Sequence, residues 1–170
     1  KLLASIENID NRCDGLIINS ENFQALSLLR EKYIGEVKCV YIDPPYNTDA
    51  SAILYKNDYK DSSWLALLDN RIKSTTALLK QSGVFCIAVD DEEVAGLRFL
   101  LSNIFKKQIG IAVVRSNPAG RKTKGRLAPS HEYALFFGQS EDAIPGSLLK
   151  SEKTLARFPK EDERCRFAWA

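Results

Sequence analysis

A nearly continuous apolar run, Gly83 to Val89, limits the fold more than any other stretch of the chain. Runs of this length and composition are typical of a central parallel strand that is covered on both faces. Asp90 and Asp91 follow at once and end the run. We therefore expect a layered α/β structure in which this strand is buried.

Strand and helix patterns alternate around this run. Short apolar segments at 16–19 and 37–42 are strand candidates, and apolar residues at helical spacing separate them. Ser20 is the expected cap of the first helix, and Gly35 is its expected stop. The alternation predicts a doubly wound, Rossmann-like α/β sheet that is mostly parallel. The expected helices cover residues 21–34, 62–80 and 94–105.

The chain changes character after Gly110. Strand candidates at 111–114 and 133–137 flank a polar loop, which predicts an antiparallel hairpin at one edge of the sheet. From about residue 140 the sequence is polar, with scattered prolines and glycines. We expect residues 1–140 to form the core and residues 141–170 to form a polar tail or linker.

Composition excludes several classes of function. A net charge of +2 says little about partners, so a nucleic-acid surface must be argued from local charge. The four cysteines form no CxxC pair and His131 is the single histidine, so we expect no metal site. Cys39 and Cys86 fall in apolar runs and are expected to be buried thiols. No segment has the roughly 18 apolar residues of a membrane span, which favours the cytoplasm.

The strand at 37–42 ends in Asp43-Pro44-Pro45-Tyr46, a segment with unusual chemistry. The two prolines lack N–H groups and hold the backbone in an extended form. The Asp43 carboxylate and the Pro44 carbonyl can accept the two hydrogens of an exocyclic amino group, while the Tyr46 ring stacks on the attached plane. In doubly wound sheets, ligands bind beyond the carboxyl ends of strands, where this segment lies.

This segment resembles motif IV of the amino-methyltransferases, which methylate the exocyclic nitrogen of adenine or cytosine in DNA. The longer form, through Asn47 and Thr48, is similar to the modification subunits of type III restriction–modification systems. Four further segments resemble that family in the same order along the chain: 16–26, 83–92, 97–105 and 130–135. The resemblance implies transfer to adenine N6 from S-adenosylmethionine, with Asp43, Pro44, Pro45 and Tyr46 as catalytic residues.

The family's Phe-x-Gly-x-Gly loop, which cradles the methionine part of S-adenosylmethionine, does not occur in this sequence. The resemblance therefore implies the amino-side catalytic half of a methylase, with the motif IV segment first and residues 141–170 leading into a linker or target-recognition region. Such a half is expected to be inactive alone. Glu21, Asn22 and Asp43 are the candidates for cofactor contact, although Glu21 and Asn22 also suit a simple helix start.

Double-stranded DNA is the expected partner, and a restriction subunit and a second copy of the chain are further candidates. Two alternatives remain open: a cytosine-N4 methylase of the same architecture, and a non-catalytic module for DNA binding or subunit docking. Basic residues without an intervening acid predict phosphate contact, although such runs also suit an exposed loop. The candidate DNA-binding residues are Asn47, Thr48, Arg115, Arg121, Lys122, Lys124 and Arg126.

Overall fold

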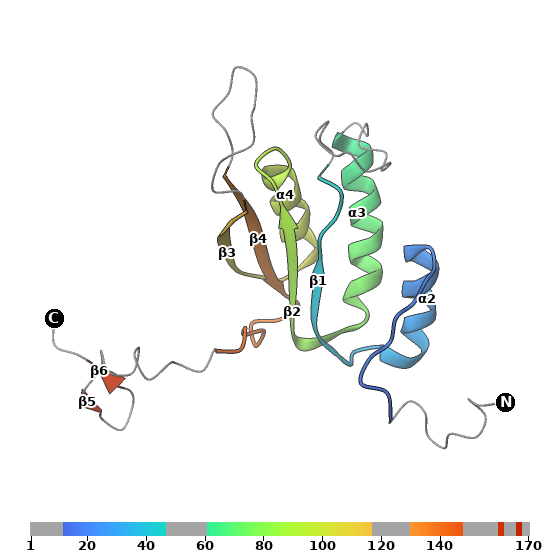
Figure 1. The fold of residues 1–170 in the computed structure, drawn as a ribbon, viewed down its shortest axis with the longest axis horizontal. Helices are drawn as coiled ribbons and strands as arrows, with labels where there is room; N and C mark the ends of the chain where they lie inside the picture. Colours follow the sequence, from blue (N-terminus) through green and yellow to red (C-terminus); the bar gives the residue numbers. More distant parts are fainter. Residues whose placement is uncertain (1–11, 47–60, 117–129, 148–159, 162–165, 168–170) are drawn as a thin grey trace.

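The computed structural model describes residues 12–46, 61–116 and 130–147, together with the backbone of two short strands at 160–161 and 166–167. Within these described residues, three helices and four longer strands alternate for most of their length (Figure 1). In chain order the elements are α2 (Asn22–Tyr33), β1 (Val37–Ile42), α3 (Asp61–Thr76), β2 (Leu79–Val89), α4 (Val94–Ile104), β3 (Lys107–Arg115), β4 (His131–Gly138), β5 (Lys160–Glu161) and β6 (Arg166–Phe167).

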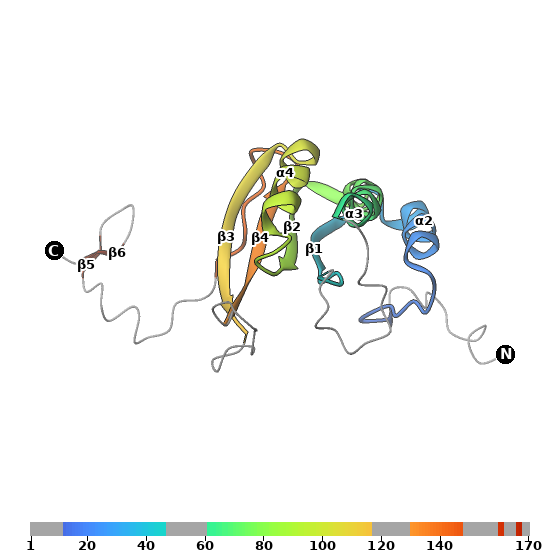
Figure 2. The same ribbon diagram turned by 90° about the horizontal axis from the view of Figure 1, so that it is seen from above.

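The four longer strands form one sheet in the order β1-β2-β4-β3, which can be followed in Figure 2. Strands β1 and β2 are parallel, whereas β4 runs antiparallel to both of its neighbours, β2 and β3. The prediction of an antiparallel hairpin at one edge is confirmed. The prediction of a mostly parallel sheet is wrong, because β4 returns from the hairpin and inserts between β2 and β3. The sheet is mixed.

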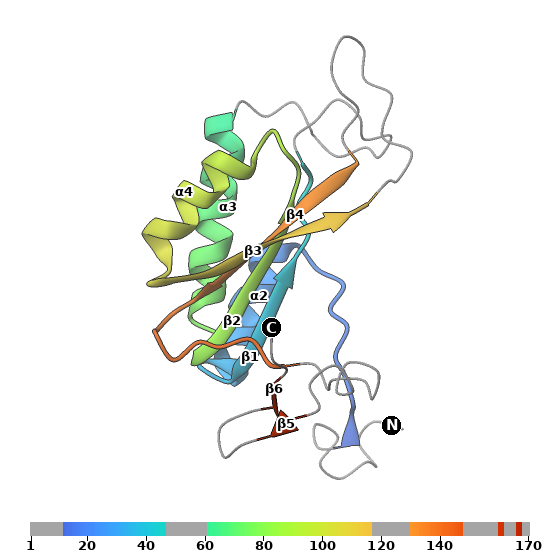
Figure 3. The same cartoon turned by 90° about the vertical axis from the view of Figure 1, so that its left-hand side faces the viewer.

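Helices α3 and α4 pack against the same face of this sheet, as Figure 3 shows from the side. The core between the layers contains Trp64 and Ile72 of α3, Leu97 of α4, Phe85 of β2 and Phe137 of β4. Burying each of these side chains contributes roughly 1.5–3 kcal/mol. The predicted strand 83–89 is confirmed as a central strand, and it begins earlier, at Leu79.

The opposite face of the sheet carries no helix among the described residues. The prediction of a doubly wound sheet, which has helices on both faces, is therefore not met by the described part of the chain. Cys39 lies exposed on β1, which corrects the expectation of a buried thiol at that position. Cys86 is buried on β2, as predicted, and burial is the main reason that its pKa rises to about 11. Tyr41, which is paired with Cys86 in register, is 63% exposed.

The amino-terminal part of the fold differs in detail from the sequence prediction. Residues 16–19 form no strand, and Ile17 is 98% exposed, because no described strand pairs with this segment. Helix α2 is capped by Glu21 and not by Ser20. Gly35, the predicted stop, follows α2 with a φ of 64°, a left-handed conformation that glycine adopts without strain. Among the described helices, none is long and apolar enough to cross a membrane.

Candidate functional site

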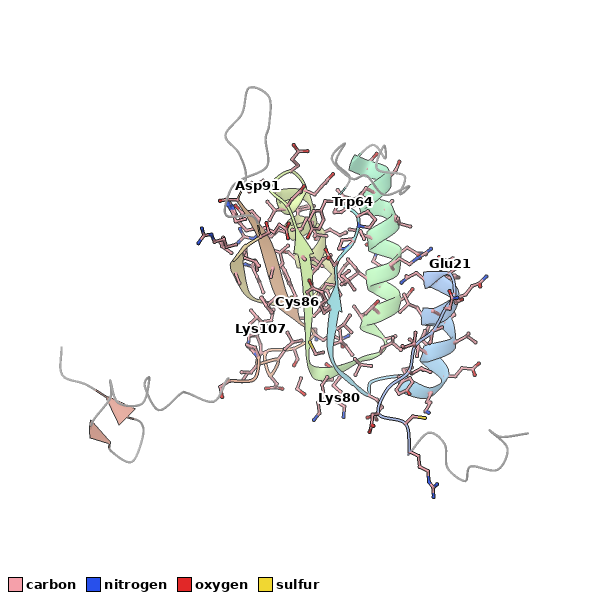
Figure 4. All side chains as sticks on the ribbon, viewed as in Figure 1. Glu21, Trp64, Lys80, Cys86, Asp91 and Lys107 are labelled. Atoms are coloured by element: carbon pink, nitrogen blue, oxygen red, sulfur yellow. The ribbon has the colours of Figure 1, made fainter. Side chains whose placement is uncertain are left out.

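Three chain segments meet at one edge of the sheet, where the word edge means the side at which strands begin or end. Ile42, the last residue of β1, is paired with Ile87 of β2, and Val89 at the end of β2 is paired with Tyr133 near the start of β4. The end of β1, the end of β2 and the start of β4 therefore lie at the same edge. Figure 4 shows Trp64 and Asp91 toward this end of the molecule, whereas Lys80 and Lys107 lie toward the other end.

Tyr46 lies beside two carboxylates at this edge. Its hydroxyl donates to Glu132 Oε2 across 3.3 Å. Burial raises the pKa of Tyr46 far above its ordinary value, and hydrogen bonding to Asp43 and the negative charges of Asp43 and Glu132 raise it further. The phenol is therefore a neutral hydrogen-bond donor at any physiological pH. The structure thus brings the predicted residues Asp43 and Tyr46 together and adds Glu132 to them.

The proline turn between these residues is held by α3. Trp64, which is 2% exposed, donates its indole N–H to the carbonyl oxygen of Pro45 at 2.8 Å. Pro44 is half-buried, whereas Asp43 and Pro45 are exposed. The fixed turn therefore presents the Asp43 carboxylate at the surface, where a ligand could reach it.

The predicted cofactor residues at the start of α2 have partners within the protein. Glu21 Oε2 accepts from the backbone N–H of Gln24 at 3.1 Å, and Glu21 Oε1 lies 3.1 Å from a guanidinium nitrogen of Arg71 on α3. Backbone N–H donation, chiefly from Phe23, lowers the pKa of Glu21, and Arg71 lowers it further. Asn22 is the first residue of α2 and is exposed. These contacts give Glu21 a structural role, and its predicted contact with a cofactor stays a prediction.

Arg115 is the one candidate DNA-binding residue that falls within the described residues. It ends β3 with an exposed side chain and is paired in register with His131. The backbone N–H of Ser116 donates to the Ser130 carbonyl at 3.2 Å, which closes the ladder at the base of the intervening segment. The other candidates lie outside the described residues: Asn47, Thr48, Arg121, Lys122, Lys124 and Arg126.

A second polar cluster joins the ends of β2 and β4. His131 Nε2 lies 3.1 Å from the Tyr133 hydroxyl and 3.6 Å from Asp91 Oδ1. Hydrogen bonding to Asp91 is the main reason that the pKa of Tyr133 is raised. Beside it, Asp90 Oδ1 accepts from the backbone N–H groups of Glu92 and Glu93.

Sequence reasoning missed Trp64 and Glu132. Neither residue belongs to a spacing pattern that points to chemistry, and each reaches the proline turn only through the tertiary fold. A weak signal existed for Glu132, because it lies in the His-Glu-Tyr segment that resembles the methylase family. Within the described residues, no group of three or more His, Cys, Asp or Glu side chains could hold a metal ion.

Comparison with known proteins decides the family of this chain. A family model described as DNA methylase, covering N6 and N4 enzymes, matches residues 37–166. The chain belongs to the DNA methylase family. The methyl donor of this family is S-adenosylmethionine. The matched range includes the whole sheet and the proline turn.

Two curated members of this family cover most of the chain. The probable type III restriction–modification enzyme HindVI Mod subunit of Haemophilus influenzae is 30% identical over 161 residues, which are 92% of this chain and 22% of that protein. The type II methyltransferase M.KpnI of Klebsiella pneumoniae is 31% identical over 151 residues, which are 83% of this chain and 36% of that protein. The chain thus spans well under half the length of either relative.

A solved methylase structure shares the fold. TTHA0409 of Thermus thermophilus, named as a DNA modification methylase, has a TM-score of 0.56 at 16% identity, and the match covers 80% of this chain and 61% of that one. The same protein complexed with S-adenosyl-L-methionine gives a TM-score of 0.51. At this identity the likeness supports the α/β methylase fold alone.

Proposed function

We propose that the protein containing this chain is a DNA methyltransferase of a restriction–modification system that transfers a methyl group from S-adenosylmethionine to adenine N6. The observation that carries the proposal is the exposed Asp43 carboxylate on a fixed proline turn, with the Tyr46 hydroxyl beside it. Membership of the DNA methylase family and the similarity to a Mod subunit support it.

The proposed chemistry begins with the amino group of a base that has left the DNA duplex. Its lone pair is delocalised into the ring, which makes the nitrogen a poor nucleophile. The two N–H groups donate hydrogen bonds, one to the Asp43 carboxylate and one to the Pro44 carbonyl. These two hydrogen bonds favour a pyramidal nitrogen with a localised lone pair. A hydrogen bond to a charged acceptor contributes roughly 1.5–3 kcal/mol. The carboxylate also stabilises the positive charge that develops on nitrogen during transfer.

The ring of Tyr46 is proposed to stack on the target base. Extrusion of a base from the duplex costs a few kcal/mol, and stacking on an aromatic side chain returns roughly 1–3 kcal/mol. S-adenosylmethionine, when bound, supplies the methyl group from its sulfonium. Of the three candidate cofactor residues in this chain, Asp43 has an exposed carboxylate at the strand edge, whereas both Glu21 oxygens have protein partners.

Cytosine N4 is the alternative target, because the matched family includes enzymes of both kinds. An aspartate at the head of the proline turn resembles the adenine enzymes more closely, which favours N6. The two targets differ in the methylated nucleoside that they leave in DNA, so a product analysis separates them.

Double-stranded DNA is the proposed substrate, and a restriction subunit and a second copy of the protein are proposed partners of the full-length form. The HindVI relative is named as the Mod subunit of a probable type III restriction–modification enzyme, which supports these proposed partners. We further propose that residues 1–140 are the catalytic part and that residues 141–170 lead into the region that reads the DNA sequence. Ala143, just beyond this division, is buried.

The test is methyl transfer by the full-length protein from labelled S-adenosylmethionine to mixed-sequence DNA, followed by mass spectrometry of the nucleosides. We expect N6-methyladenine from the wild type and none from Asp43→Ala, which should still bind DNA. Asp43→Asn, which keeps the shape of the side chain and removes its charge, should also lose most transfer. Detection of N4-methylcytosine in place of N6-methyladenine would show that cytosine is the target base. DNA binding without any methyl transfer would support the non-catalytic module.

A further inference from the structure

Two carboxylates share one phenol at the candidate site. The Tyr46 hydroxyl donates to Glu132 Oε2 at 3.3 Å, and the Asp43 carboxylate is near enough to help raise the pKa of the same phenol, after the larger effect of burial. A phenol carries a single proton, so it makes one strong hydrogen bond as a donor. The two carboxylates therefore compete for the one hydrogen bond that the phenol can donate. Which of them accepts it decides how many acceptor sites Asp43 can offer to a ligand.

Glu132 approaches the turn from a fixed place on the sheet. Its neighbour Tyr133 is paired with Val89 of β2, and Ala134 is paired with Ala88. Because side chains alternate along a strand, Glu132 faces away from the helix layer that buries Leu135. Trp64 holds Pro45 from the helix layer, so the turn is held from both sides of the sheet.

We propose that Glu132 is a positioning residue that accepts the hydrogen bond of the Tyr46 hydroxyl and so leaves the Asp43 carboxylate available to the amino group of the target base. This inference rests on the proposed function of the site. Without Glu132, the phenol donates to Asp43 instead, occupies one of its acceptor sites and makes the carboxylate a weaker acceptor.

A double-mutant cycle on the full-length methyltransferase tests this role. The variants are Glu132→Ala, Glu132→Gln, Tyr46→Phe and Tyr46→Phe combined with Glu132→Ala, and kcat and KM are measured for DNA and for S-adenosylmethionine. We expect Glu132→Ala to lower kcat roughly 10- to 100-fold, the size of one hydrogen bond to a charged group. The KM for S-adenosylmethionine should stay within about twofold. Glu132→Gln, whose side-chain carbonyl still accepts, should recover most of the loss.

The decisive comparison is made in the Tyr46→Phe background. Since that variant keeps the ring and lacks the proton, Glu132→Ala should then change kcat by less than about twofold. Glu141→Gln is the matched control, because its exposed side chain follows the opposite end of β4, and it should behave as wild type. Thermal melting of each variant separates loss of folding from loss of positioning.

The outcomes separate two failures. Transfer by the wild type with additive losses in the cycle, or with equal losses from Glu132→Ala and Glu132→Gln, would overturn the role of Glu132 and leave the proposed function intact. Absence of transfer by the wild type would overturn the proposed function, and the role of Glu132 with it.

Discussion

At the scale of single residues, the proline turn owes its position to Trp64. The indole ring fills the core between α3 and the sheet, while its one N–H group holds the Pro45 carbonyl. Packing and hydrogen bonding can therefore be separated by substitution at this position, because phenylalanine keeps an aromatic ring and removes the donor.

We expect Trp64→Phe to lower the free energy of unfolding by about 1–2 kcal/mol and Trp64→Ala to lower it by about 3–5 kcal/mol. Urea unfolding measures both values. Phe99→Ala is the control, because Phe99 is an aromatic residue of α4 that is 74% exposed, and its loss should cost less than about 0.5 kcal/mol. Equal costs for Trp64→Phe and Trp64→Ala would mean that the hydrogen bond, and not the ring, dominates.

Sequence reasoning could identify the candidate residues that sit next to one another in the chain. Asp43 and Tyr46 are joined by a short, rigid turn, so their spacing already implies proximity. Glu132 lies 86 positions from Tyr46, and only strand pairing brings the two together. A single sequence carries no direct signal for such a contact, which is why Glu132 and Trp64 became visible only in the structure.

At the scale of elements, helix α2 is joined to α3 by an ion pair between Glu21 and Arg71. Glu21 also caps α2, so one carboxylate serves both contacts. The sequence predicts Ser20 as the cap because hydroxyl side chains suit that position, but the longer glutamate can reach both the helix start and Arg71. Arg71 lies over the Phe23 ring as well, at 5.0 Å from its centroid.

The contacts of Glu21, chiefly the backbone N–H of Phe23 and to a smaller extent Arg71, predict a pH dependence of stability. The pKa of Glu21 is lowered in the folded state, so its contribution is present above the ordinary value of 4.5 and is lost as the pH falls through the lowered pKa. We expect Glu21→Gln to lower the urea midpoint at neutral pH and to match the wild type in acid. Glu31→Gln, a change at another exposed carboxylate of α2, should have little effect at either pH.

The turn after β4 packs tightly against the end of that strand. A Cβ atom added at Gly138 would collide with the Cβ of Ala143, which is buried. Lys107 at the start of β3 reaches the same turn and donates to the carbonyl oxygens of Glu141 and Ala143 at 2.6 and 3.1 Å. The turn is therefore part of the packed sheet edge.

We expect Gly138→Ala to cost about 1–3 kcal/mol of unfolding free energy through overpacking. Adding Ala143→Gly should recover part of that cost, because it removes the atom that the new methyl group meets. Gly110→Ala in β3 is the control: its added Cβ meets nothing within 4 Å, so the change should be nearly neutral. Failure of Ala143→Gly to rescue would show that the collision is relieved elsewhere.

The order and type of most elements followed from periodicity, whereas the direction of the strands did not. Val37–Ile42 and the helix at 94–105 are visible as short apolar patterns bounded by polar residues or glycine. The pattern at 133–137 is equally visible, but it cannot tell whether that strand pairs with β2 or only with β3. Insertion of β4 beside β2 buries Leu135 and Phe137 in the core shared with the helices, which is a tertiary effect.

At the scale of the whole molecule, the candidate site exists only when the sheet is complete. The proline turn follows β1, Trp64 comes from α3, and Glu132 comes from β4. Because these contacts join distant parts of the chain, their formation costs more loop-closure entropy than that of local helices. Strand β3 ends at Arg115 on the same edge, so an exposed cation lies on the edge where the DNA is proposed to bind.

We expect the triple change Arg121→Gln, Lys122→Gln and Lys124→Gln in the full-length protein to weaken DNA binding and to flatten its salt dependence, by about 0.9 in slope for each phosphate that is no longer neutralised. Filter binding over a range of salt concentrations measures the slope. The control is a triple change at exposed cations toward the other edge of the sheet, Arg30→Gln, Lys38→Gln and Lys106→Gln. Equal slopes for both triple variants would show that these three residues do not neutralise DNA phosphates.

The hydrogen bond from Ser116 to Ser130 has a consequence for how such proteins can diversify. It fixes the separation of the two strand ends, so residues 117–129 can be lengthened or exchanged without shifting the register of β4. For a flexible connection between two fixed points, a doubling of its length costs only about 0.6 kcal/mol more. Exchange of this segment is therefore expected to leave Glu132, two positions beyond the bond, in its place beside Tyr46.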